Sequence, residues 1–165
     1  MQTLYRKLMM IELHRTNRLV DAIMAKRMLD SLSSYYPDFE YWYVNKAMPG
    51  IVTGNDILVV AREHEQLVGV GLGKARDNET KLRCVRVAPS HQNRGTGLRI
   101  IDRMLEELED DKPHCTVCEE MLHLYSAPFV NRYGFDLTRV GKHTYRRGKL
   151  EYVFNAREQY AESTL

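Results

Sequence analysis

The sequence lacks a long apolar stretch and has few cysteines. No run approaches the ~18 apolar residues that a membrane-spanning helix requires, and residues 1–17 lack the apolar centre of a secretory signal peptide. The three cysteines are an odd number, and 165 residues can build a core that needs no disulfide cross-links. We therefore expect a protein of the reducing cytoplasm with no membrane partner.

Long runs of one charge are also missing. The chain has 24 Lys and Arg against 22 Asp and Glu, which gives a net charge of +2. Basic residues gather at one place, around Arg146 and Arg147, and such a turn is most often simply solvated. We therefore expect no nucleic-acid partner, and this basic turn is the one feature that would suggest RNA.

Repeats, low-complexity tracts and linkers are absent, so we expect one domain over residues 1–165. Residues 5–13 fit a first strand or the start of a helix. Apolar residues recur near the helical period in 17–33, which predicts a helix there. The aromatic-rich segment 38–48 predicts a second helix, with Pro49-Gly50 as its end.

From residue 56 the pattern becomes that of strands. Two β runs fill 56–76 around a turn near Glu63–Gln66. The glycines in 69–74 lie within the second run and indicate strand flexibility or a bulge. The segments that follow are a strand at 81–89 ended by Pro89, an amphipathic helix at 97–110, a short strand at 114–118, a helix from Ser126 to Gly134, and paired strands at 135–143 and 149–155. This order predicts a mixed α/β sheet of six or seven strands.

The stretch HQNRGTGLRI, residues 91–100, joins a predicted strand to a predicted helix. The first N–H groups of a helix have no internal partner and lie at the positive end of its dipole, so they favour anions. Gly95 and Gly97 let the backbone approach a phosphate, while Arg94 and Arg99 add charge. The stretch therefore predicts an anion site.

Two common phosphate motifs do not fit this loop. A P-loop needs Lys followed by Ser or Thr after its last glycine, where this chain has Leu98-Arg99. The dinucleotide fingerprint needs a third glycine at position 100, which is Ile100.

The pattern V-x-P-x-x-Q-x-x-G-x-G, from Val87 to Gly97, resembles the coenzyme A loop of the GNAT superfamily of N-acetyltransferases. The preceding strands, the following helix and FVNRYGF at 129–135 extend this resemblance over about 56–155, the expected coenzyme A-binding core. It implies a GNAT-like α/β fold, an α+β mixed sheet. Such a fold has six to seven mostly antiparallel strands, a central splayed pair and about four flanking helices.

The resemblance also implies how acetyl-CoA is bound as co-substrate. The strand would splay near Val85–Val87, so that its free backbone pairs with the pantetheine arm, and the N–H of Val87 would polarise the thioester carbonyl. The residues implied in binding are Val85, Arg86, Val87, Gln92, Asn93, Arg94, Gly95, Thr96, Gly97 and Leu98.

Direct transfer to an amine in a ternary complex requires a base for the ammonium and an acid for the leaving thiolate. Candidate bases are Glu79, before the central strand, and Glu119, after the short strand. The alternative for Glu79 is a solvated residue in a turn, and the alternative for Glu119 is an acid favoured in the first turn of a helix. Glu120 is a further candidate base, with the same alternative as Glu119. The tyrosine that the family often has four residues before the glycine is Val130 here, so Tyr133 becomes the candidate acid. A packing role competes for Tyr133, and weaker candidates are Tyr125 and Tyr145.

The sequence thus predicts an acetyl-CoA-dependent N-acyltransferase for an amine of unknown class. A non-catalytic acyl-CoA-binding sensor or scaffold is the alternative function, and aminoacyl-tRNA is an alternative acceptor. The aromatic segment 35–43 suits an acceptor wall, the core or a homodimer face. We expect no metal, because His114, Cys115 and Cys118 leave Cys84 alone to complete a site of four ligands.

Overall fold

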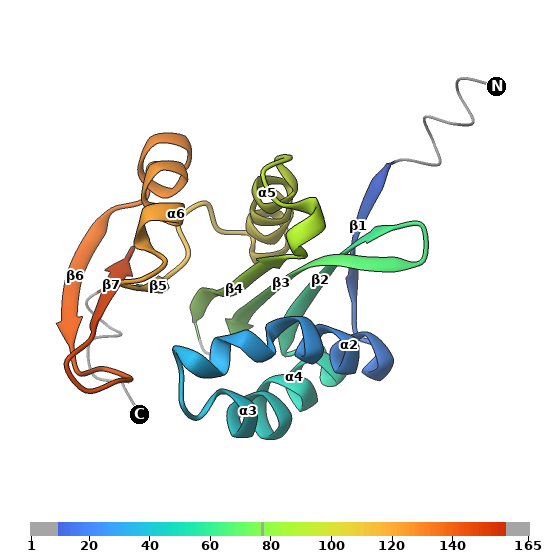
Figure 1. Cartoon of the computed structure of the whole chain (residues 1–165), viewed down its shortest axis with the longest axis horizontal. Coiled ribbons are helices and arrows are strands. Elements are labelled where there is room, and N and C mark those ends of the chain that lie inside the picture. Colours follow the sequence, from blue (N-terminus) through green and yellow to red (C-terminus); the bar gives the residue numbers. More distant parts are fainter. Residues whose placement is uncertain (1–9, 77, 158–165) are drawn as a thin grey trace.

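The fold is known from a computed structural model that describes residues 10–76 and 78–157. Helices cover both faces of a central sheet (Figure 1). The first sheet holds β1 (Ile11–Thr16), β2 (Asp56–Glu63), β3 (Gln66–Arg76) and β4 (Glu79–Val87) in this order, all antiparallel. The second sheet holds β5 (Cys115–Cys118), β7 (Leu150–Phe154) and β6 (Leu137–Lys142) in this order, also antiparallel. The predicted mixed α/β fold with mostly antiparallel strands is confirmed.

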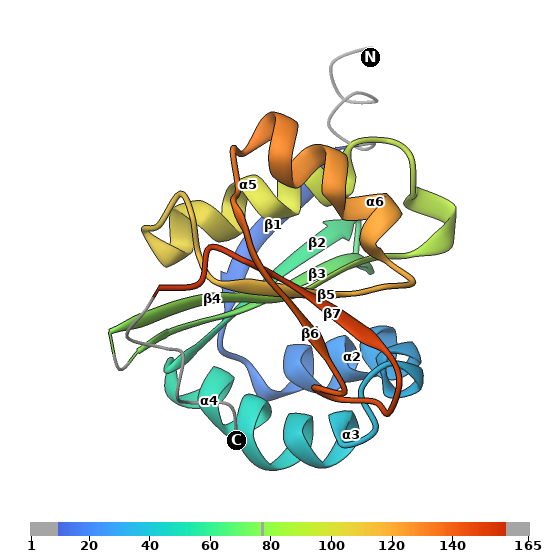
Figure 2. The ribbon, with the colours of Figure 1, turned by 90° about the vertical axis from the view of Figure 1, so that its left-hand side faces the viewer.

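One helix, α5 (Thr96–Leu108), lies on one face of the first sheet, and α6 (Leu122–Ala127) lies on the same side of the molecule (Figure 2). The other face carries α2 (Leu19–Leu29), α3 (Phe39–Trp42) and α4 (Met48–Thr53). Each face has its own apolar core. Ile57, Val59, Ala61, Ile100 and Met104 belong to the α5 side, and Ala25, Tyr43, Ile51, Leu58 and Val60 belong to the other.

Three alternate glycines of β3 bring α5 close to the sheet. A Cβ on Gly71 would lie 2.7 Å from Ile100 Cγ2 and 2.8 Å from Met104 Cγ. A Cβ on Gly69 would lie 2.6 Å from Ile100 Cδ1, and one on Gly73 would lie 2.6 Å from Met104 Cε. The glycines that predicted strand flexibility or a bulge are explained by packing, because α5 occupies the space that their side chains would fill.

The expected end of the second helix at Pro49-Gly50 is wrong. The helical run starts at α3, passes through a π turn at Tyr43–Ala47 and continues as α4 to Thr53, where Gly54 ends it with φ +81°. The wider π turn accommodates the proline ring, which would otherwise clash with the carbonyl one turn back. Gly50 serves a close approach instead, because a Cβ there would lie 1.9 Å from Asp56 Oδ2.

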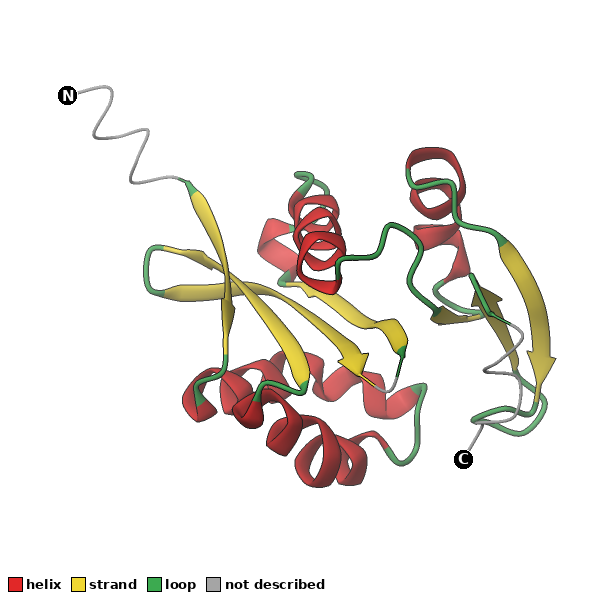
Figure 3. Ribbon diagram, turned by 180° about the vertical axis from the view of Figure 1, so that it is seen from behind, coloured by secondary structure: helices red, strands yellow, loops and turns green. Residues whose placement is uncertain are grey.

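A second helical run also continues through a proline, Pro128. The helix expected to start at Ser126 starts at Leu122, and a π turn at Pro128–Arg132 continues it (Figure 3). Its predicted end is confirmed, with Gly134 at φ +63°. Other expectations also hold: the 56–76 hairpin, the strand before Pro89, the helix after the glycine loop and the final hairpin are all present. Most of the uncertain segment 5–13 lies outside the described residues.

Candidate functional site

The two sheets meet at β4 and β5, which run parallel and then separate. The N–H of His114 donates to the Thr80 carbonyl and the N–H of Leu82 donates to the His114 carbonyl, each at 3.0 Å. Beyond this point β4 bulges, because the pairing with β3 passes from Leu82 to Cys84 and leaves Arg83 as an extra residue. The two strands then diverge, as the resemblance implied.

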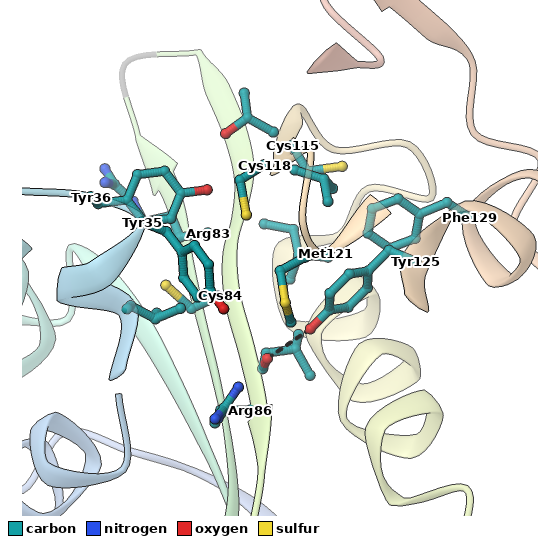
Figure 4. Close-up of a pocket in the computed structure, with 15 residues that line it drawn as sticks. Tyr35, Tyr36, Arg83, Cys84, Arg86, Cys115, Cys118, Met121, Tyr125 and Phe129 are labelled. Carbon is teal, nitrogen blue, oxygen red and sulfur yellow. Dashed lines mark hydrogen bonds between the residues drawn. The ribbon is translucent and has the colours of Figure 1, made fainter. Parts of the chain in front are cut away.

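A cleft opens between the diverging strands (Figure 4). The α2–α3 connection contributes Tyr35 and Tyr36 from one side. From the other side come Tyr125 of α6 and Met121, the residue just before that helix. The strand residues that line the cleft are Leu82, Arg83, Cys84, Val85 and Arg86 of β4 and Cys115, Thr116, Val117 and Cys118 of β5.

Tyr125 reaches into this cleft from α6. Its hydroxyl donates to the carbonyl of Val85 at 3.0 Å, so the main-chain polar groups of Val85 face the gap, not β3. Burial raises the pKa of Tyr125 to about 12, so the hydroxyl carries its proton at neutral pH. The cleft therefore holds a proton donor beside a free strand edge.

The glycine loop lies where β4 ends. Asn93 and Gly95 have φ of +60° and +78°, and α5 begins at Thr96 without a side-chain cap on its first N–H groups. A Cβ on Gly97 would meet only a Val87 methyl at 3.7 Å, so no packing within the described chain requires a glycine there. The open space above Gly97 suits a ligand that approaches the helix N-terminus.

Apart from Thr96, which is buried, the predicted cofactor-binding residues form one continuous surface. The side-chain amide of Gln92 donates to the Val87 carbonyl at 3.0 Å, which ties the loop to the strand. Arg86 and Val87 also line a second cleft against Met24 and Met28 of α2. The structure thus brings together the strand segment Val85, Arg86 and Val87 with the loop and helix start Gln92, Asn93, Arg94, Gly95, Thr96, Gly97 and Leu98.

Tyr133, the predicted acid, faces α5 instead of the cleft. Its hydroxyl hydrogen-bonds Asp102 at 2.7 Å and lies 3.2 Å from the Leu98 carbonyl. Val130, at the family's tyrosine position, is 49% exposed, whereas Phe129 and Tyr125 line the cleft. The π turn adds a residue to this turn of the helix and so changes which side chains face inward.

The two predicted bases are held in ion pairs. Glu79 contacts Lys74 Nζ at 2.7 Å and His114 Nδ1 at 3.5 Å. Burial acts to raise the pKa of Glu79, but Lys74, Lys81 and His114 together outweigh it and hold the pKa below the usual value. Glu119 bonds Lys149 at 2.9 Å and accepts the N–H of Leu150, and both contacts lower its pKa. Neither carboxylate is poised to take a proton near neutral pH.

Glu151 is an acid that sequence reasoning missed. It lies on β7 opposite Cys118 and is 2% exposed, and neither carboxylate oxygen has a hydrogen-bond partner. Burial raises its pKa to about 7, although Arg146 acts in the opposite direction. Side chains alternate along a strand, so position 151 lies on the same inward face of β7 as Val153. This alternation was the signal from which the burial of Glu151 could have been predicted.

The basic turn is largely paired within the chain. Arg146 binds both carboxylate oxygens of Glu120, at 2.8 and 2.7 Å, and lies 5.5 Å from the Tyr35 ring. The pKa of Glu120 falls to about 2 as a result. His143 accepts the N–H of Gly148 at 2.7 Å. Among the described residues there is no cluster of His, Cys, Asp and Glu fit for a metal, and no helix long and apolar enough to span a membrane.

A parallel strand pair that separates beside a glycine-lined helix N-terminus is the arrangement that the GNAT resemblance implied. The sequence profile described as "Acetyltransferase (GNAT) domain" matches residues 37–151. The chain belongs to this family of GNAT acetyltransferases.

Solved structures share the fold at low sequence identity. A protein described as a GNAT-family acetyltransferase of Desulfovibrio desulfuricans has a TM-score of 0.70 and 18% identity, over 88% of this chain and 97% of its own. The diaminobutyrate acetyltransferase EctA of Paenibacillus lautus, solved with its substrate and coenzyme A, has a TM-score of 0.66 and 15% identity, over 88% and 95%. The ribosomal-protein-S18-alanine N-acetyltransferase of Escherichia coli has a TM-score of 0.64 and 13% identity, over 90% and 97%. None of the curated proteins compared with the sequence matches it significantly.

Proposed function

We propose that this protein transfers the acetyl group of acetyl-CoA directly to an amine in a ternary complex. The observation that carries the proposal is the continuous surface from the β4–β5 gap to the N-terminus of α5. It offers an edge of β4 that pairs with no further strand among the described residues, although Tyr125 and Gln92 already bond the carbonyls of Val85 and Val87. The edge continues to the N-terminus of α5, which has no side-chain cap. This order fits a ligand with a pantetheine arm and a pyrophosphate.

Each part of this surface has a distinct role. The N–H groups at the start of α5, with Asn93 and Gly95 in left-handed conformation, bind the pyrophosphate. The gap-facing main chain of Val85 hydrogen-bonds the pantetheine amides. The N–H of Val87 points the same way as that of Val85, two residues earlier, and polarises the thioester carbonyl. The thioester supplies the activated acetyl group.

Two side chains are proposed for the proton transfers. The Tyr125 hydroxyl lies in the gap and is protonated at neutral pH, so it can protonate the leaving thiolate. Glu151 pairs with Cys118, which lines the cleft, and its pKa of about 7 matches a proton acceptor that works near neutral pH. A water between Glu151 and the amine would carry that proton. Glu79 and Glu119 remain weaker candidates because of their ion pairs.

Calorimetric titration of acetyl-CoA and coenzyme A tests the first half of the proposal. Micromolar binding is expected, and the absence of binding would refute it. A panel of amines, with release of free thiol as the readout, tests the second half. Acetyl-CoA binding without turnover of any amine would favour the second candidate, a sensor or scaffold, which the valine at position 130 first suggested.

A further inference from the structure

A second cavity adjoins the transfer cleft on the side of α3. Its volume is about 390 Å³, within the range of small-molecule sites. It shares Tyr36, Leu82, Arg83, Cys84 and Thr116 with the cleft. Its further lining residues are Pro37, Asp38, Phe39, Trp42, Lys81, Thr144 and Tyr145. A molecule in this cavity would therefore reach the point where β4 and β5 separate.

Two cations from β4 line this cavity. Lys81 lies just before the bulge of β4 and Arg83 is its extra residue, and both side chains line the cavity. The Arg83 guanidinium lies 4.9 Å from the centre of the Trp42 ring, and its buried Nε has no hydrogen-bond partner. Burial and the charge of Arg83 lower the pKa of Lys81, and the charge of Glu79 acts in the opposite direction without reversing the shift.

The nearby acids do not neutralise these cations by direct contact. Asp56 attracts Arg83, but its carboxylate lies under Gly50 and 4.0 Å from Arg76. Glu79 is bonded to Lys74 and His114, and Asp38 is exposed at the edge of the cavity. Within residues 10–76 and 78–157, no carboxylate hydrogen-bonds to Lys81 or Arg83.

A half-buried cation without a bonded anion is partly desolvated at a cost, and an anionic ligand would offset that cost. We propose that the acceptor amine also carries a carboxylate, held by Lys81 and Arg83, with its carbon chain or ring against Trp42 and Tyr36. This inference rests on the proposed transfer reaction and names its substrate class.

The position of the cations also sets the length of the acceptor. Along β4, Val85 and Val87 lie two and four residues beyond Arg83, which is about 7 to 13 Å at the rise of a strand. The amine must attack near these residues while the carboxylate stays at Lys81 and Arg83. An amine several carbons away from its carboxylate spans this distance, whereas an α-amino acid does not.

Matched pairs of amines test the proposal. We would titrate 6-aminohexanoate and hexylamine, and 4-(aminomethyl)benzoate and benzylamine, into the protein saturated with coenzyme A, and measure kcat/KM for each with acetyl-CoA. The carboxylate member is expected to bind about ten- to a hundredfold more tightly, since a hydrogen-bonded charge pair contributes on that scale.

Charge variants locate the effect. Arg83→Met and Lys81→Met should each reduce the preference within a pair, and the double variant should abolish it. Arg83→Lys should keep most of it. Lys46→Met removes the same charge from an exposed position outside the cavity, and should leave the preference unchanged. The ratio within a pair is the readout, so a general loss of activity or binding cancels, and melting curves check that each variant folds.

The outcomes separate the inference from the proposed function. Equal binding and turnover of both members refutes the carboxylate site but leaves the transferase intact. A preference that persists in the double variant also refutes it, as does the absence of binding by either carboxylate at 10 mM. If acetyl-CoA fails to bind while the free protein still prefers the carboxylates, the transferase proposal fails and the anion site stands.

Discussion

Replacing Gly97 with glutamate should weaken coenzyme A binding strongly without weakening the fold. Gly97 lies in the first turn of α5, and a Cβ there would make one ordinary contact, 3.7 Å from Val87. A side chain in place of glycine favours the helix by up to about 1 kcal/mol. An acid in the first turn adds about 0.3–1 kcal/mol through the helix dipole. The variant should therefore melt no lower than the wild type.

The same carboxylate would stand against the pyrophosphate. Two like charges about 5 Å apart repel by about 3 kcal/mol at an effective dielectric constant of 20. This corresponds to about a hundredfold in Kd for one phosphate charge. Gly97→Gln adds nearly the same bulk without charge, so it separates steric from electrostatic loss.

Titration calorimetry with acetyl-CoA, at low and at high salt, decides between the two effects. The glutamate variant should lose about a hundredfold more affinity than the glutamine variant, and salt should narrow the gap because it screens charges. Wild-type affinity in the glutamate variant would show that α5 does not hold the pyrophosphate. Equal losses in both variants would show that no phosphate charge lies near this turn.

Three further outcomes are expected. Tyr125→Phe keeps the ring but loses the proton donor, so kcat should fall about a hundredfold with little change in the Kd of acetyl-CoA, measured by steady-state kinetics and calorimetry. The raised pKa of Glu151, about 7 against 4.5, means that stability falls as pH rises from 4.5 to 7. Relative to wild type, the free energy of unfolding of Glu151→Gln should rise by about 3 kcal/mol between pH 4.5 and 7, measured by urea melts. A difference between the two proteins that does not change with pH would contradict the assignment. Gly71→Ala places a Cβ 2.7 Å from Ile100 and 2.8 Å from Met104, so it should destabilise by about 1–3 kcal/mol in thermal melts. An unchanged melting temperature would show that α5 moves away at no cost.

The strands and the glycine loop could be predicted because their signals are local. Short apolar runs around a tight turn mark β2 and β3, and alternation marks β4. The glycines at 95 and 97 mark a turn whose backbone must stay open. The helix boundaries at Pro49 and Pro128 could not be predicted by the same rules. A proline ends a regular α-helix, but a π turn beside each proline lets the run continue, and nothing local in the sequence announces that turn.

Side-chain roles depended on register and could not be predicted from spacing alone. Tyr125 reaches the gap and Tyr133 does not, because the π turn between them rotates the faces of one helical run. Glu79 and Glu119 look free in the sequence, yet each meets a lysine in the fold. Glu151 looks like an ordinary strand residue until the pairing of β7 with β5 buries it.

The two halves of the site therefore differ in how much the sequence reveals. The coenzyme A half is recognised mainly by backbone groups, so its requirements appear as glycines and a strand–loop–helix order that local rules detect. The acceptor half that we propose is built from side chains of three distant segments, around Trp42, Arg83 and Tyr145. Each of these residues has an ordinary structural role when considered alone. In the fold they line one cavity, together with Lys81. Lys81 and Arg83 have no bonded acid among the described residues, and this pair of cations is what suggests a carboxylate on the acceptor.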